Sequence, residues 1–179
     1  MDEMSEMKNE KPYTIEDIYA LPEGQRAELI NGVWYDLAAP TATHQQILGN
    51  VFAAIHTYLK EKNGPCRVYP APFAVFLKAD EYTYLEPDIS VVCDPSKVDE
   101  RGCVGAPDWV IEIVSPGSRR MDYLVKTHLY QNAGVKLYWI VDLKEKIVTV
   151  DDFEHGEVEH HAFGEPIPVS MYPGLTVTV

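Results

Sequence analysis

Apolar residues along the chain follow two different spacings. Short runs rich in Val and Ile, bounded by Pro, Asp or Ser, are typical of buried strands, whereas apolar residues that recur every three or four positions are typical of amphipathic helices. Strands are expected at 67–78, 86–92, 108–115, 136–142, 147–152 and 157–163, and helices at 41–62 and 118–133. The pattern predicts an α/β (α+β) fold, in which helices flank a mixed twisted sheet and residues 147–179 form a C-terminal β extension.

Turn and capping residues indicate where several elements begin and end. Thr14 can cap a short N-terminal helix. A β-hairpin is expected around Asn31-Gly32, because this dipeptide is the strongest short turn signal in the chain. Thr41 or Thr43 can cap the long helix, which the Asn-Gly-Pro sequence at 63–65 ends.

The second half of the chain contains one predicted loop and one further helix. Residues 94–105 are polar and contain proline and glycine, so they are expected to form a loop. Ser118 is expected to cap the following helix, and Gly134 to end it. The buried line of that helix is expected to comprise Met121, Val125 and Leu129.

Length and composition restrict the class of protein. The 179 residues favour one domain at 12–179, preceded by a disordered acidic tail at 1–11, and 46% hydrophobic residues exclude a wholly disordered chain. No apolar run has the length of a membrane span, and the first ten residues do not resemble a signal peptide, so we expect a cytoplasmic protein with no membrane partner. Cys66, Cys93 and Cys103 form no CxxC pair and are odd in number, which predicts reduced, unremarkable thiols.

The net charge of -13 weighs against nucleic-acid binding, which depends on Lys and Arg neutralising phosphates. Acidic residues are concentrated, however, in 1–10 and 151–165, while Arg119, Arg120 and Lys126 gather in one segment. We therefore expect an uneven potential, in which tight binding of nucleic acid needs Mg²⁺ or a partner.

Two of the predicted strands each carry an acidic residue in an apolar setting. Alternation in 108–115 places Glu112 on the same face as Val110 and Val114, where a carboxylate needs a cation, a proton or a metal ion. Asp88 follows Pro87 at the start of the other strand. If the two strands are neighbours, both carboxylates converge, and two carboxylates with water and a phosphate oxygen are a common Mg²⁺ arrangement.

Such a metal site suits phosphodiester hydrolysis, because the ion activates water and neutralises developing charge. A fixed cation near the scissile phosphate would assist, and Lys126 is the candidate. The alternative for Lys126 is an ordinary surface pair with Asp122, one helical turn earlier. Tyr130 shares that helix face and can hydrogen-bond the site.

Several short segments together resemble the Uma-type branch of the PD-(D/E)xK nuclease superfamily, a branch of restriction endonucleases. The likeness covers roughly residues 13–142. In that branch an apolar residue, here Val114, stands where the superfamily usually has a lysine, and a helix lysine takes its place. The segments that carry the likeness are Glu28-Leu29-Ile30-Asn31-Gly32, Pro40-Thr41 with His44, Glu86-Pro87-Asp88, Glu112-Ile113-Val114-Ser115-Pro116, Lys126, Gly134-Val135 and Tyr138-Trp139-Ile140-Val141-Asp142.

The resemblance implies a restriction-endonuclease-like fold and a set of site residues. Asp88 and Glu112 would bind Mg²⁺ or Mn²⁺ together with the backbone carbonyl of Ile113, and Lys126 would orient or deprotonate the attacking water. Glu28 would help to hold the metal or orient the lysine. Its alternatives are a cross-strand pair with Arg26 or a solvated strand edge.

The resemblance also implies a substrate and an assembly. The substrate would be nucleic acid, expected to be DNA, and a homodimer would serve cleavage of two strands. His44, Arg119 and Tyr130 are the candidate substrate contacts; from the residues alone, His44 is better explained as a partly exposed residue at the start of a helix, and the resemblance favours the substrate contact.

Two other classes of protein remain open at this stage. The acidic composition and the missing strand lysine also fit a nuclease-like scaffold that serves as a catalytically inactive binding or assembly module. A structural protein with a buried ion pair between Glu112 and Lys126 is the third possibility. Fold alone does not decide among the three.

Overall fold

The computed structural model describes residues 11–179, so the acidic tail predicted at 1–11 lies outside the described residues except for Lys11. Its centre is a six-stranded sheet in the order β11-β10-β9-β8-β5-β3. All neighbours in this sheet are antiparallel except β8 and β9, which are parallel, so the predicted mixed sheet is confirmed. The strands are β3 (Arg67–Pro70), β5 (Ile89–Val92), β8 (Trp109–Val114), β9 (Leu137–Asp142), β10 (Ile147–Asp152) and β11 (Glu157–Ala162).

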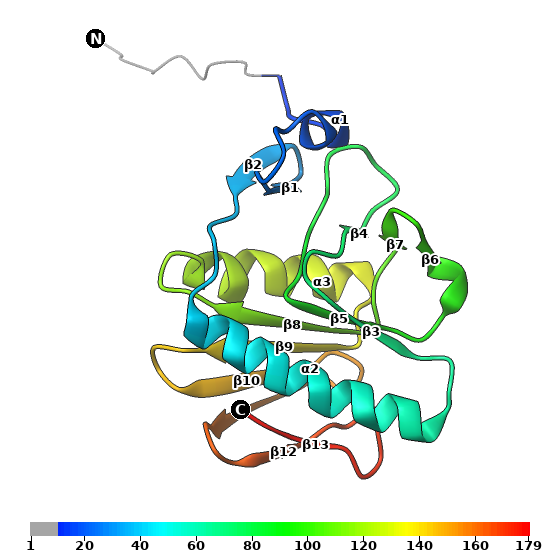
Figure 1. The fold of residues 1–179 in the computed structure, drawn as a ribbon, viewed down its shortest axis with the longest axis vertical. Helices are drawn as coiled ribbons and strands as arrows, with labels where there is room; N and C mark the ends of the chain where they lie inside the picture. Colours follow the sequence, from blue (N-terminus) through cyan, green and yellow to red (C-terminus); the bar gives the residue numbers. More distant parts are fainter. Residues whose placement is uncertain (1–10) are drawn as a thin grey trace.

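Helices cover both faces of this sheet, because each strand of its centre is apolar on two sides (Figure 1). On one face α2 (Ala42–Lys62) packs with Val51, Ile55 and Leu59 against the side of β8 that carries Trp109 and Ile111. On the other face α3 (Thr127–Ala133) packs against the opposite side of β8 and β9. Glu112 belongs to this second face.

The C-terminal residues cover the α2 face beside that helix. Strands β12 (Pro166–Pro168) and β13 (Thr176–Thr178) form a separate antiparallel ladder, with Ile167 and Val177 buried in the same core cluster as α2. The predicted β extension is therefore present, although its last strand pairs with β12 and not with the main sheet.

The N-terminal elements form a smaller unit at one end of the sheet (Figure 1). It comprises α1 (Ile15–Tyr19), with a capping box at Thr14, and the hairpin of β1 (Ala27–Ile30) and β2 (Val33–Asp36). The hairpin turns at Asn31-Gly32, where both residues have left-handed backbone conformations, as predicted. This turn sets the register that directs Glu28 inward.

The predicted loop at 94–105 is wrong, since it contains regular structure. A 3₁₀ turn at Pro95–Lys97 leads into β6 (Val98–Asp99) and β7 (Gly102–Val104), which join β4 (Val75–Phe76) in a three-stranded sheet. These strands are two or three residues long, too short for a two-residue period to be visible in the sequence.

The helix predicted from Ser118 differs in type and in buried face. Arg119 and Arg120 are α-helical, Met121–Lys126 form a π-helix, and the α-helix resumes in α3. Hydrogen bonds from residue i to i+5 widen each turn, and this changes which side chains face the sheet. Val125, predicted to be buried, is 38% exposed, whereas Asp122 and Lys126 are buried.

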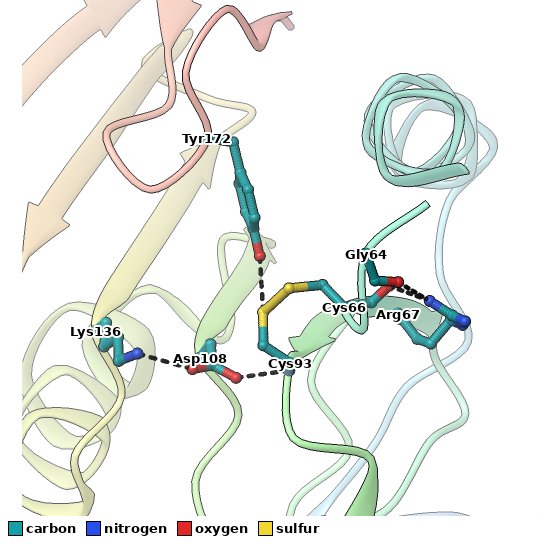
Figure 2. The surroundings of a disulfide bond; sticks show 7 residues. All are labelled: Gly64, Cys66, Arg67, Cys93, Asp108, Lys136 and Tyr172. Atoms are coloured by element: carbon teal, nitrogen blue, oxygen red, sulfur yellow. Dashed lines mark hydrogen bonds and ion pairs between the residues drawn. A yellow bond between two sulfur atoms is a disulfide. The ribbon is translucent and has the colours of Figure 1, made fainter. Parts of the chain in front are cut away.

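The cysteines also differ from the prediction of free thiols. Cys66 and Cys93 form a disulfide between the ends of β3 and β5, whose register places Arg67 opposite Val92 and hence the two cysteines opposite each other (Figure 2). Only Cys103 is free among the cysteines, all of which lie in the described part of the chain, and burial raises the pKa of its thiol to about 11. In residues 11–179 we find no helix with the length and apolar character needed to cross a membrane.

Candidate active site

Glu112 lies in the middle of the sheet with its side chain on the α3 face. It is 5% exposed, on the same side of β8 as Val110 and Val114, as the alternation predicts. Its Oε1 accepts hydrogen bonds from the Nζ of Lys126 at 2.8 Å and from the hydroxyl of Tyr130 at 2.9 Å. The buried carboxylate thus has both a cation and a neutral donor.

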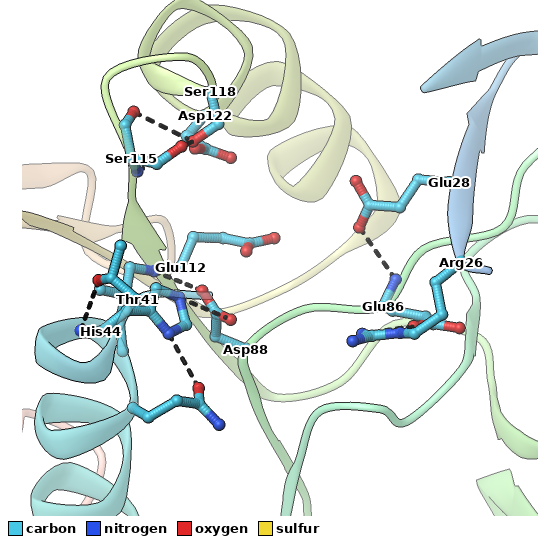
Figure 3. Close-up of polar contacts among 12 residues, drawn as sticks. Arg26, Glu28, Thr41, His44, Glu86, Asp88, Glu112, Ser115, Ser118 and Asp122 are labelled. Carbon is cyan, nitrogen blue, oxygen red and sulfur yellow. Dashed lines mark hydrogen bonds and ion pairs between the residues drawn. The ribbon is translucent and has the colours of Figure 1, made fainter. Parts of the chain in front are cut away.

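Lys126 is surrounded by carboxylates from three separate elements. Its Nζ lies 2.8 Å from Glu112 of β8, 2.9 Å from Glu28 of β1 and 3.6 Å from Asp122 of the π-helix. Figure 3 shows the three acids reaching toward the space between these elements. We call Glu28, Glu112, Asp122 and Lys126 the carboxylate cluster; in it three acids share one ammonium group.

The excess of acid over base governs protonation in the cluster. Burial, followed by the other acids, raises the pKa of Glu112 well above its ordinary value, although Lys126 opposes the shift. Burial raises the pKa of Asp122 in the same way. For Lys126, burial disfavours the charge, but attraction to Glu112, Glu28 and Asp122 prevails and raises its pKa well above the usual value. The lysine is therefore a firmly charged group, and the raised pKa values make Glu112 and Asp122 the members of the cluster that favour binding a proton.

Glu28 is held in the cluster by a second contact as well. Its Oε1 accepts a hydrogen bond from the backbone N–H of Glu86 at 3.0 Å. Arg26, the alternative partner considered for Glu28, instead pairs with the side chain of Glu86 at 2.6 Å (Figure 3). Glu28 is 3% exposed, so it is not a solvated strand edge either.

Asp88 forms a second group beside the cluster, where β5 begins next to β8. Its Oδ2 accepts a hydrogen bond from the backbone N–H of Ile113 at 2.7 Å, and its Oδ1 lies 3.1 Å from Nε2 of His44. The hydrogen bond to Asp88 raises the pKa of His44 against the opposing effect of burial, and the backbone of Ile113 contributes in the same direction. His44 lies in the first turn of α2, whose N-cap is Thr41.

Arg119 lies apart from both groups. Its guanidinium pairs with Asp142 at 3.4 Å and with Glu145 at 3.0 Å, and it stacks over the ring of Tyr123. Its side chain is 45% exposed. The structure thus brings Glu28, Glu112, Lys126 and Tyr130 together, places Asp88, Ile113 and His44 beside them, and leaves Arg119 on the surface.

A family model described as "Uma2: Putative restriction endonuclease" matches residues 15–179. The chain belongs to the Uma2 family. It is also similar to a solved structure from Anabaena variabilis, described as "a putative nuclease belonging to DUF820", with 26% sequence identity and a TM-score of 0.73. That likeness covers 93% of this chain and 95% of the other. The comparison with curated proteins gives no match.

Membership of the Uma2 family and the likeness to this structure both support a nuclease-like function. Restriction-endonuclease-like families generally use divalent metal ions. Within residues 11–179, no group of three or more His, Cys, Asp and Glu side chains is arranged to hold such an ion. Mg²⁺ needs fewer protein ligands, however, since it binds through one or two carboxylates and keeps waters and phosphate oxygens. Asp88, the Ile113 carbonyl and Glu112 offer oxygen donors of the type that Mg²⁺ prefers.

Asp122 is the member of the cluster that sequence reasoning missed. Its spacing from Lys126 indicated a surface ion pair, yet both side chains are about 95% buried. The hydroxyl of Tyr138 donates to the backbone carbonyl of Asp122 at 3.1 Å, which fixes the π-helical turn against β9. The position of Tyr130 one turn beyond Lys126 on the same helix was the available signal that this face points into the protein.

Proposed function

We propose that this Uma2 protein is a divalent-metal-dependent endonuclease that hydrolyses phosphodiester bonds of DNA. The observation that carries the proposal is the carboxylate cluster, with Lys126 held between Glu112 and Glu28, adjoining Asp88. It combines the fixed cation and the acidic oxygen ligands that phosphoryl chemistry uses.

The energetic cost of the cluster supports a functional role. Burying an ion pair roughly breaks even at best, and surplus buried carboxylates must be protonated or must destabilise the fold. Here three acids face one lysine, and burial already raises the pKa values of Glu112 and Asp122. Apolar side chains of similar size would stabilise this position better, so a purely structural ion pair is a poor explanation.

The residues take the following roles in the proposal. Asp88 and Glu112, with the backbone carbonyl of Ile113, hold Mg²⁺ or Mn²⁺, which supplies activation of water and neutralisation of phosphate charge. Lys126 orients the attacking water, and its firmly held charge favours this role over abstraction of a proton. Glu28 and Tyr130 fix the positions of the Lys126 and Glu112 side chains through the hydrogen bonds described above.

Substrate binding has to overcome the net charge of -13. A bound divalent ion offsets part of this charge at the site itself, so we expect affinity for DNA to depend on the metal. In this proposal Arg119 contacts the DNA backbone, and it would have to leave Asp142 and Glu145 to do so. Cleavage of both strands is served by a homodimer with one site for each strand.

The test is cleavage of supercoiled plasmid in Mg²⁺ or Mn²⁺, with EDTA as the blank. Glu112→Gln should abolish cleavage and keep the circular-dichroism spectrum, whereas Glu159→Gln, on the exposed strand β11, should cleave like wild type. Cleavage retained by Glu112→Gln would overturn the assignment.

A catalytically inactive binding or assembly module is the second candidate. It is favoured by the side chains of residues 11–179, among which no group of three or more His, Cys, Asp and Glu could hold a metal ion. It would be supported further by a Lys126 directed to bulk solvent, but this side chain is 6% exposed. A protein that neither binds divalent metal nor cleaves any plasmid would belong to this class.

A further inference from the structure

We propose that His44 is a direct ligand of the divalent metal through Nε2, and that the site consequently prefers Mn²⁺ to Mg²⁺. The inference rests on the proposed function, because it adds a nitrogen ligand to the metal that Asp88 would hold. Imidazole favours first-row transition ions, whereas an all-oxygen site suits Mg²⁺. His44 would therefore decide which metal the protein uses.

The distance between the two side chains fits neighbouring ligands of one ion. Nε2 of His44 lies 3.1 Å from Oδ1 of Asp88. Two ligands bound at right angles, each about 2.1 Å from a metal, are about 3 Å apart. The backbone N–H of Ile113 donates to the other Asp88 oxygen at 2.7 Å, which fixes the orientation of this carboxylate.

The second ring nitrogen shows why a cation is needed between His44 and Asp88. Nδ1 of His44 lies 3.1 Å from Oε1 of Gln45, which can only accept, so this nitrogen carries the hydrogen. A neutral ring would then direct the lone pair of Nε2 at a carboxylate oxygen, which is repulsive. A positive charge between the two atoms, either a proton or a metal ion, removes the repulsion. A metal-binding histidine commonly has its other N–H held in this way.

The position of His44 is rigid at the backbone and reachable at the side chain. Its N–H donates to Oγ1 of Thr41 at 3.2 Å, which ties it into the capped first turn of α2. The His44 and Asp88 side chains are 12% and 18% exposed, in contrast to the almost fully buried Lys126. An ion from solvent can therefore reach this pair without the fold opening.

Electron paramagnetic resonance of bound Mn²⁺ tests the inference in the full-length protein. Spin-echo modulation detects the ¹⁴N nucleus of a coordinated imidazole, and the amount of free Mn²⁺ gives the affinity. We expect ¹⁴N modulation in wild type and its loss in His44→Gln. The variant should bind Mn²⁺ at least about tenfold more weakly, because mutating even a residue that only hydrogen-bonds a metal ligand typically lowers metal affinity about tenfold or more. Mg²⁺ affinity, measured by calorimetry, should fall less.

A matched control lies on the same helix. His56 is exposed three turns further along α2, where its ring stacks on Phe52. His56→Gln should keep the ¹⁴N modulation and the affinity of wild type, and circular dichroism of both variants checks the fold.

The outcomes separate this inference from the proposed function. Wild type that binds Mn²⁺ and cleaves plasmid without ¹⁴N modulation would overturn the His44 ligand and leave the nuclease proposal intact. Equal or tighter Mn²⁺ binding by His44→Gln would also overturn it, and would make His44 a competitor of the metal. Modulation that persists in His44→Gln would show that another histidine is the source. Wild type that binds no divalent ion would overturn both proposals.

Discussion

Removing the ammonium group of Lys126 should destabilise the protein strongly, because the three carboxylates of the buried cluster would be left with no cation. In Lys126→Met the apolar part of the side chain is kept while the charge is lost. The Nζ lies 2.8 Å and 2.9 Å from Glu112 and Glu28, and the side chain is 6% exposed. Breaking a buried pair of this kind by removing one partner costs about 3–5 kcal/mol of unfolding free energy.

The unfolding free energy lost in Lys126→Met should increase as the pH rises. A carboxyl whose pKa is raised in the folded state holds more protons folded than unfolded, so stability falls as pH rises from its ordinary value, near 4.5 for Glu112, to its folded value. Without Lys126 the folded pKa values of Glu112 and Asp122 rise further. The pH range over which stability falls then extends to higher pH. Each carboxyl then contributes up to about 1.4 kcal/mol per pH unit. The deficit of Lys126→Met should therefore be larger at pH 8 than at pH 5.5.

Urea denaturation followed by tryptophan fluorescence measures the deficit. Trp109 and Trp139 are fully buried in the sheet, so their emission reports the loss of the fold. Lys60→Met, an exposed position on α2, is the control and should change stability by less than about 0.5 kcal/mol. A deficit for Lys126→Met below about 1 kcal/mol, equal at both pH values, would refute the buried cluster as described.

Three further substitutions test separate contacts. Tyr130→Phe loses the hydrogen bond to Glu112 and should lower stability by about 1.5–3 kcal/mol in the same denaturation assay, and an unchanged midpoint would argue against the contact. Cys66→Ser removes the bridge to Cys93 across 27 residues and should cost about 3–4 kcal/mol; a wild-type midpoint insensitive to reducing agent would contradict this. Asp122→Asn removes one surplus acid, so its stability at pH 8 should equal or exceed that of wild type, and a clear loss there would show that Asp122 is a needed partner of Lys126.

Local patterns were sufficient to predict most of the sheet and the long helix. The two-residue alternation of 109–114 predicted both faces of β8, and Asn31-Gly32 predicted the hairpin, because each signal depends on neighbouring residues. Thr41 and Asn63 predicted the ends of α2 for the same reason. The neighbouring positions of β5 and β8, which the metal hypothesis required, are confirmed by their antiparallel pairing.

Contacts that depend on distant parts of the chain could not be derived in this way. Glu28 and Lys126 are 98 positions apart, and only the tertiary fold brings the β1 hairpin against the π-helix. The disulfide depends on the register of β3 on β5, which the cysteine count alone does not reveal. Burial of Asp122 depends on the π-helical turn, because a regular α-helix with the predicted buried line would have left Asp122 and Lys126 on its surface.

The most direct test of the proposed function is a calorimetric titration with Mg²⁺ and Mn²⁺, with plasmid cleavage scored in the same samples. It compares wild type with the double variant Asp88→Asn, Glu112→Gln, which keeps both side-chain shapes and removes both charges. We predict that wild type binds the ions and cleaves, and that the double variant does neither while remaining folded. Metal-dependent cleavage that survives in the double variant would contradict the account.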